Sequence, residues 1–100
     1  MEITKKPEND KLCIAVEGRL DTVTSPQLED EIRSSLDGVN ELILDFEKLD
    51  YISSAGLRVV LVAQKLMDAK ANGSLKVVNM GEVVKDVFDV TGFSDIITIE

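Results

Sequence analysis

The sequence contains no histidine and a single cysteine among 100 residues. Histidine is the usual general acid or base near neutral pH, and clusters of histidine and cysteine hold structural zinc. A glycine-rich phosphate loop of either standard spacing is also missing. These absences exclude most catalytic and metal-binding machinery, so we expect a protein that is not an enzyme, has no catalytic or metal-ligating residues and needs no cofactor.

The lone cysteine, Cys13, has no partner for an intrachain disulfide. Its neighbours Leu12 and Ile14 are typical of a strand. We therefore expect a packed thiol with no redox role.

Positive charge is scarce, with 11 Lys and Arg against 19 Asp and Glu and a formal net charge of −8. Nucleic acids and anionic membranes attract clusters of basic side chains, whereas the basic residues here are scattered. No apolar run approaches the roughly 18 residues that span a bilayer, and the N-terminus lacks a signal-peptide stretch. We expect a cytoplasmic protein that binds neither nucleic acid nor membrane, and whose partner has a basic surface.

What is present is typical of a folded domain: 44% of the residues are hydrophobic and 30% are charged. The length predicts one domain over residues 1–100. Alternating apolar residues predict a strand over 11–18, a shorter edge strand lies around Ile3, and the turn formers at 7–10 join them as an antiparallel hairpin.

The rest of the chain alternates helices with strands. A helix begins with Thr24 or Ser25 as its cap and ends at Gly38, and the apolar run 41–46 predicts a central strand covered by helices on both faces. The later elements are a helix over 55–71 that stops at Asn72 and Gly73, a strand over 75–80, a helix between Gly81 and Gly92, and a strand over 96–99. The order β-β-α-β-α-β-α-β predicts a small mixed α/β sheet, mostly parallel with an N-terminal antiparallel strand and about three helices.

The segment 49–58 is the unusual one, because Ser53 and Ser54 lie where a strand-to-helix connection meets a helix. Serine there serves as a helix cap. Gly56 in the first turn costs about 1 kcal/mol relative to alanine and suggests that a partner or a kinase approaches the backbone closely. A phosphate at this position faces free N–H groups and the positive end of the helix dipole, so both capping and modification are open.

The helix that follows has a wide apolar arc expected to face the sheet, formed by Val59, Val62, Ala63, Leu66, Met67 and Ala69. Leu57 and Leu61 fall on its polar side. They are either satellite core residues or an exposed apolar patch beside Ser54.

Residues 50–61, Asp-Tyr-Ile-Ser-Ser-Ala-Gly-Leu-Arg-Val-Val-Leu, resemble the signature of the STAS domain of bacterial anti-sigma-factor antagonists. The likeness extends to Gly-Arg-Leu-Asp at 18–21, Leu-Ile-Leu-Asp at 42–45 and Thr-Gly-Phe-Ser-Asp-Ile-Ile at 91–97. It implies a STAS-like fold and a partner-switching cycle. In that cycle the unphosphorylated antagonist binds an anti-sigma factor that is also a serine kinase, which releases a sigma factor; phosphorylation ends the complex, and a metal-dependent serine phosphatase resets it.

Carried over by position, the resemblance makes Ser54 the phosphorylated residue. Ser53 replaces the family's Asp and is the alternative acceptor, and Ala55 replaces a Ser or Thr. Asp21 and Thr22 match a loop beside the acceptor, although Asp21 serves equally well as a turn former or helix cap. The partner-binding residues that follow are Asp21, Thr22, Ser53, Ser54, Ala55, Gly56, Leu57, Arg58 and Leu61.

Two other functions compete with this one. The first is a constitutive STAS scaffold in a signalling or transport assembly, with Ser54 only a helix cap. The second is a hydrolase or transferase with Ser54 as nucleophile, which has no histidine base and needs a lysine in its place.

Overall fold

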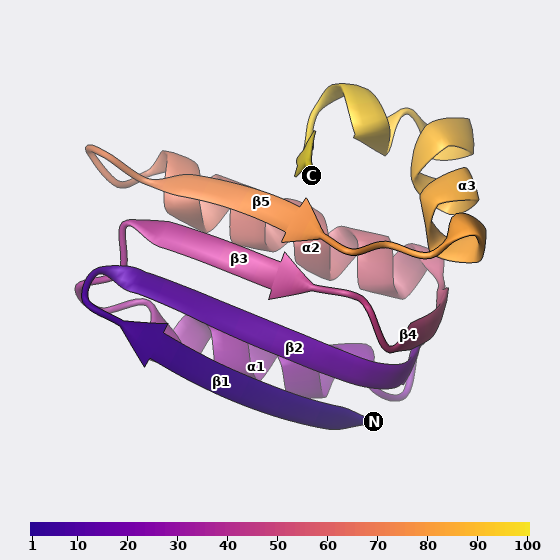
Figure 1. Cartoon of the computed structure of the whole chain (residues 1–100), viewed down its shortest axis with the longest axis horizontal. Helices are drawn as coiled ribbons and strands as arrows, with labels where there is room; N and C mark the ends of the chain where they lie inside the picture. Colours follow the sequence, from indigo (N-terminus) through magenta and orange to yellow (C-terminus); the bar gives the residue numbers. More distant parts are fainter.

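The computed structural model describes residues 1–100 as three α-helices and a six-stranded sheet (Figure 1). The elements are β1 (Glu2–Glu8), β2 (Lys11–Leu20), α1 (Ser25–Ser35), β3 (Glu41–Asp45), β4 (Leu49–Ile52), α2 (Ser54–Asp68), β5 (Ser74–Val78), α3 (Glu82–Thr91), a 3₁₀ turn (Phe93–Asp95) and β6 (Thr98–Ile99). In the sheet the order is β1-β2-β3-β5-β6, and β4 pairs with β2. Strand β1 is antiparallel to β2 and the other pairings are parallel, which confirms the predicted fold class.

Strand β4 is an addition to the predicted order, which left its residues in a connection. It pairs in parallel with the end of β2, and the register shifts at Gly18 and Arg19. Because of this irregularity Asp50 and Tyr51 are both exposed in succession, between the buried Leu49 and Ile52. Four residues without alternation of apolar and polar side chains give no strand signal.

Helices α1 and α2 lie side by side behind the sheet, and the strands are in front of them in Figure 1. In β3, Leu42 and Leu44 are fully buried, whereas Ile43 between them is only half-buried. The prediction that helices cover this strand on both faces is therefore wrong. One face of the sheet is packed against α1 and α2, and the other is open.

The core contains 23 buried residues, which come from the three α-helices, from strands β2 to β5 and from the connections between elements. In α2 the buried face is made by Gly56, Leu57, Val59, Val60, Ala63 and Met67. Leu57 thus takes the core role that was one of its two expected ones, and Leu61 and Leu66 are half-buried. Ala69 is exposed, which corrects the predicted arc at its C-terminal end. The buried face of α2 already begins at Gly56, because the first turn of the helix packs on Leu20 of β2 and Ile52 of β4.

The boundaries of several elements differ from the predicted ones. Helix α2 begins one residue earlier, at Ser54, and ends at Asp68, well before Asn72. Strand β1 includes Pro7, which an edge strand tolerates because its outer N–H groups need no partner in the ladder. No helix is long and apolar enough to cross a bilayer.

Candidate functional site

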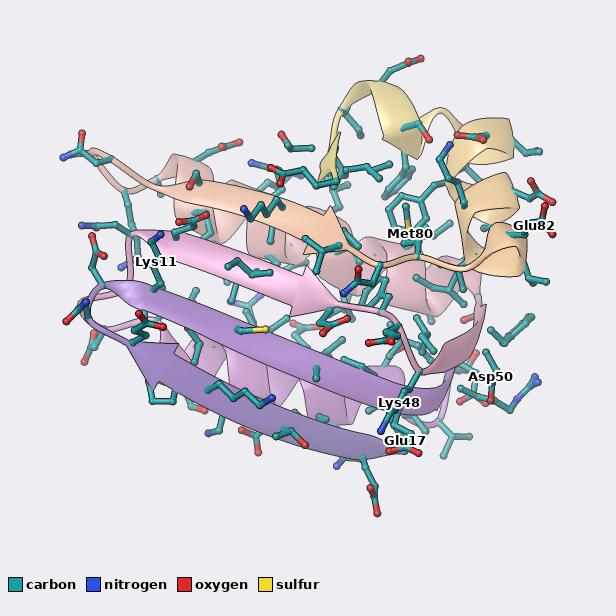
Figure 2. All side chains as sticks on the ribbon, viewed as in Figure 1. Lys11, Glu17, Lys48, Asp50, Met80 and Glu82 are labelled. Atoms are coloured by element: carbon teal, nitrogen blue, oxygen red, sulfur yellow. The ribbon has the colours of Figure 1, made fainter.

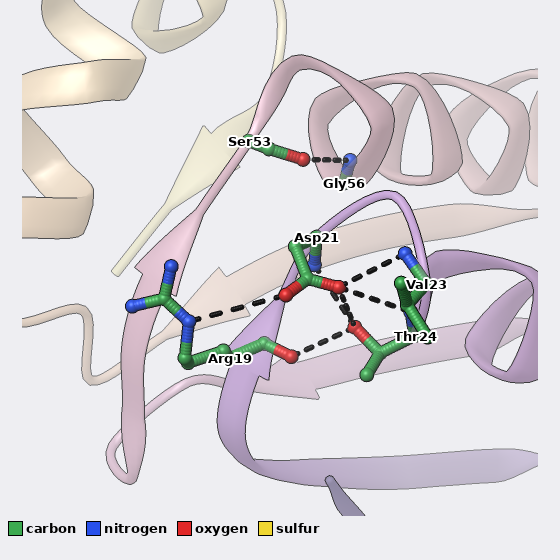
Figure 3. Close-up of polar contacts among 6 residues, drawn as sticks. All are labelled: Arg19, Asp21, Val23, Thr24, Ser53 and Gly56. Carbon is green, nitrogen blue, oxygen red and sulfur yellow. Dashed lines mark hydrogen bonds and ion pairs between the residues drawn. The ribbon is translucent and has the colours of Figure 1, made fainter.

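Two loops meet where β2 and β4 end. Leu20 and Ile52 are partners in the parallel pairing, so the residues that follow them, Asp21 and Ser53, leave the sheet at the same edge. The Ser53 N–H donates to the Leu20 carbonyl at 2.9 Å and ties the two loops together. Figure 3 shows the resulting arrangement, with the loop after β2 beside the start of α2. The pairing of β4 with β2 is thus what builds the site.

Asp21 organises the first of these loops. Its Oδ1 accepts the backbone N–H groups of Val23 at 3.0 Å and Thr24 at 3.1 Å (Figure 3). The N–H of Thr24 is the main cause that holds the pKa of Asp21 below its ordinary value, and the Val23 N–H and the Arg19 guanidinium add to it. Asp21 is therefore a turn former, which is one of the two roles expected for it.

The start of α1 is not capped as predicted. Thr24 occupies the cap position, but its hydroxyl accepts the Asp21 N–H at 2.9 Å and donates to the Arg19 carbonyl at 2.8 Å, so it makes no cap bond. Ser25 is already inside the helix and 3% exposed, and its Oγ has no hydrogen-bond partner. In place of a cap from Thr24 or Ser25, the Asp21 carboxylate accepts the backbone N–H groups that precede the helix.

The two serines of the second loop have different places. Ser53 is the cap of α2, with its Oγ accepting from the Gly56 N–H at 3.5 Å and its carbonyl accepting from the Leu57 N–H at 2.9 Å. Ser54 is the first helical residue and is exposed. The capping role considered for Ser54 therefore belongs to Ser53, and the Ser54 hydroxyl is not the cap.

Gly56 is buried, and its missing side chain is explained by the fold. A Cβ built there would lie 2.7 Å from Cγ1 of Ile52 and 2.9 Å from Cγ of Leu20. The protein's own core thus accounts for the glycine, and the approach of a partner or kinase to the backbone here stays a prediction. Gly56 and Leu57 are both buried beneath the first turn of α2, so neither presents surface to a partner.

The other predicted residues do reach the surface together. Thr22, Ser54 and Arg58 are exposed, and Asp21, Ser53, Ala55 and Leu61 are partly exposed. A crevice separates the first turns of α1 and α2, and it is lined by Thr22, Ser25, Pro26, Glu29, Asp30, Ala55, Arg58 and Val59. An ion pair joins its two walls, from Arg58 Nη2 to Glu29 Oε1 at 3.1 Å.

Three surface residues of this edge were missed from the sequence. Arg19 lies over the ring of Tyr51, with its Cζ 4.2 Å from the ring centroid, because the two are partners in the β2 and β4 pairing. Val23 is 86% exposed at the tip of the first loop. Recognition of β4 would have brought Arg19 and Tyr51 together; an apolar residue in a loop gives no comparable signal.

The structure contains no group of three or more carboxylate, thiol or imidazole side chains that could hold a metal. Cys13 is partly buried on the open face of the sheet. Burial raises the pKa of its thiol, and the nearby Asp45 carboxylate raises it further, which disfavours the reactive thiolate.

Comparison with known proteins gives the family. The model of the STAS domain matches residues 1–100. BtrV of Bordetella bronchiseptica, named among the anti-sigma factor antagonists, is 34% identical over 99% of this chain and 85% of its own length, and the anti-sigma-B factor antagonist of Bacillus subtilis is 32% identical over 95% and 85%.

Solved structures share the fold. Unphosphorylated SpoIIAA, an anti-sigma factor antagonist, is 22% identical with a TM-score of 0.85 over 99% of this chain and 88% of its own. SpoIIAA of Bacillus in its phosphorylated form has a TM-score of 0.76 at 20% identity, over 99% and 91% of the two chains. Since the family model spans every residue and two relatives exceed 30% identity over nearly the whole chain, this protein belongs to the STAS domain family.

Proposed function

We propose that this protein is an anti-sigma-factor antagonist whose binding is switched off by phosphorylation of Ser54. The observation that carries the proposal is the exposed Ser54 at the first position of α2, with the cap supplied by its neighbour Ser53. The hydroxyl is accessible to a kinase, and its modification leaves the cap in place. The names of the two relatives support the antagonist role.

The start of α2 suits a phosphate. Its first turn holds no acidic residue, and its free N–H groups and positive dipole end favour an added charge of about −1.5 to −2. SpoIIAA has been solved with and without its phosphate in the same fold, which supports a domain that survives the modification. Partner binding, rather than folding, is then the property that changes.

The proposed partner is an anti-sigma factor that is also a serine kinase, and it acts on the unphosphorylated form in the cytoplasm. It transfers the γ-phosphoryl group of ATP to Ser54 Oγ; ADP leaves, and the hydroxyl proton is released. A metal-dependent serine phosphatase reverses this by hydrolysis, which returns the serine and inorganic phosphate. The chain itself is the substrate in both reactions and performs neither.

The test is incubation of the purified protein with ATP and the serine kinase encoded nearest to it in its genome, followed by mass spectrometry. We expect one phosphate, located on Ser54, which is absent in Ser54→Ala and retained in Ser53→Ala. Phosphate on Ser53 would move the switch by one residue. A chain that binds the kinase but is never phosphorylated would instead favour a constitutive scaffold.

A further inference from the structure

Arg58 ties α2 to α1 through a shared carboxylate. Its Nη2 donates to Glu29 Oε1 at 3.1 Å, while Glu29 Oε2 accepts from Arg33 Nε at 2.9 Å within α1. Each oxygen of Glu29 therefore has its own guanidinium partner. Of the two arginines, only Arg58 connects the helices.

Ser54 lies one helical turn before Arg58 on the same helix. Residues at this spacing are neighbours on a helix surface, and a helical side chain leans toward the turn that precedes it. The guanidinium of Arg58 thus has two anionic positions within reach: the Glu29 carboxylate and a phosphate on Ser54. An acidic group four residues before a basic one is also the favourable order.

We propose that phosphorylation of Ser54 makes Arg58 exchange partners, from Glu29 on α1 to the phosphate on its own helix, which breaks the ion pair between the helices. This inference rests on the proposed function for the identity of the modified serine. The phosphate offers about two charges and three acceptor oxygens, which a planar guanidinium binds in bidentate fashion. Glu29 offers Arg58 one oxygen.

After the exchange, Arg58 and Glu29 each still have a partner of opposite charge. The Arg58 side chain is 64% exposed and free to turn, whereas that of Glu29 is only 18% exposed. Because Glu29 keeps its pair with Arg33, its largely covered carboxylate does not lose its last cationic partner. The phosphate therefore gains a ligand at little cost to the rest of the site.

The consequence reaches beyond Ser54 itself. Arg58 and Glu29 both line the crevice between α1 and α2, together with the unpartnered hydroxyl of Ser25. Removal of the guanidinium from this crevice exposes acidic groups there. The phosphorylated surface thus differs from the unmodified one in two places, the new dianion and the altered crevice.

The experiment uses the full chain with phosphoserine inserted at position 54 during translation, so no kinase is needed. We follow the Arg58 side-chain nitrogen signal by NMR in the serine and phosphoserine forms, each with and without Glu29→Gln. Glu29→Gln is expected to shift this signal in the serine form and to leave it unchanged in the phosphoserine form. In a ³¹P titration, Arg58→Gln should raise the second pKa of the phosphate by about 0.3 unit or more. Lys65→Gln, which removes an exposed positive charge in the last turn of α2, is the matched control and should leave the titration unchanged.

The proposal is overturned if Glu29→Gln shifts the Arg58 signal equally in both forms, or if Arg58→Gln leaves the ³¹P titration unchanged. Either result leaves the proposed function intact, because the phosphate is supplied without the kinase. If the kinase does not modify Ser54, the proposed function is refuted, but the NMR and ³¹P results remain valid because they do not depend on the kinase.

Discussion

The two ends of the sheet differ in how far the chain satisfies its own polar groups. Lys11 lies at one end and Asp50 at the other in Figure 2. At the amino end of the parallel strands, the Glu41 carboxylate pairs with Lys11 at 3.4 Å and with Lys76 at 3.5 Å. Backbone N–H groups there are also satisfied by neighbouring turns, as when Ser74 donates to the Asn40 carbonyl at 2.8 Å. This end is closed by the chain's own contacts.

The carboxyl end carries groups that the chain does not satisfy itself. Helix α2 starts there without an acidic residue in its first turn, Ser54 is exposed, and Val23 and Tyr51 are 86% and 37% exposed. Ligands of open α/β sheets bind at this end because helix N-termini and loops collect there. The comparison teaches that a charge added at the carboxyl end should change binding, whereas one added at the amino end should not.

The largest effect should come from Ser54→Asp, which places a negative charge on the proposed binding surface. We expect it to weaken binding to the proposed kinase partner by about 100-fold, or about 2.7 kcal/mol, because the interface must accommodate an uncompensated charge. Calorimetric titration measures it. Ser34→Asp is the matched control: Ser34 is an exposed serine near the other end of α1, and its change should leave the affinity within about twofold of the parent. Equal losses in the two variants would remove the distinction between the ends.

The next effect concerns stability. Gly56→Ala should lower the free energy of unfolding by about 1–3 kcal/mol, because the new methyl group meets Ile52 and Leu20 at less than 3.0 Å. Gly81→Ala, at the cap position of α3, is the control: nothing lies within 4 Å of its added Cβ, and we expect only the cost of a poorer cap residue, about 0.5–1 kcal/mol. Urea denaturation compares the two. If Gly56→Ala left the free energy of unfolding unchanged, the first turn of α2 would pack more loosely than described.

A smaller effect is expected at the cap of α2. Ser53→Ala should cost about 1 kcal/mol of unfolding free energy, because the Gly56 N–H loses its acceptor. Ser53→Asp keeps a capping oxygen and should retain the parent's stability. If Ser54→Ala cost as much as Ser53→Ala in the same thermal unfolding series, the assignment of the cap to Ser53 would be wrong.

The smallest effect is the pH dependence contributed by Asp21. Its folded pKa is lowered by the Thr24 N–H, so its stabilising contribution is complete above the unfolded value of about 3.9 and is lost as the pH falls through the lower folded value. Asp21→Asn should therefore be less stable than the parent at pH 6, and the difference should shrink below about pH 4. Thermal unfolding from pH 6 to pH 2 measures it; a difference that stays constant over this range contradicts the lowered pKa.

The sequence was sufficient for the architecture because its signals are periodic. Alternation over 11–18 and apolar residues every four positions in α1 correspond to the observed strand and helix. Strand β4 was missed because the register shift beside Gly18 exposes two successive residues and removes the alternation. The open face was missed because Ile43 is apolar although only half-buried, so β3 resembles a strand covered on both sides.

The start of α2 was predicted to within one residue, and that residue decides which of the two serines is the cap. The motif located the two serines, but the start of α2 depends on the hydrogen bond from Ser53 to Leu20 across the β2 and β4 pairing. Likewise, Gly56 was correctly identified as unusual, but only packing shows that Ile52 and Leu20 require it. Contacts between Arg19 and Tyr51 or between Arg58 and Glu29 join distant segments, which no local pattern encodes.

The central claim is tested most directly by one titration of the proposed kinase partner with two forms of the full chain, one with serine and one with phosphoserine at position 54. The account predicts that the serine form binds and that the phosphoserine form binds at least about 100-fold more weakly. Equal affinity of the two forms would contradict a phosphorylation switch at Ser54.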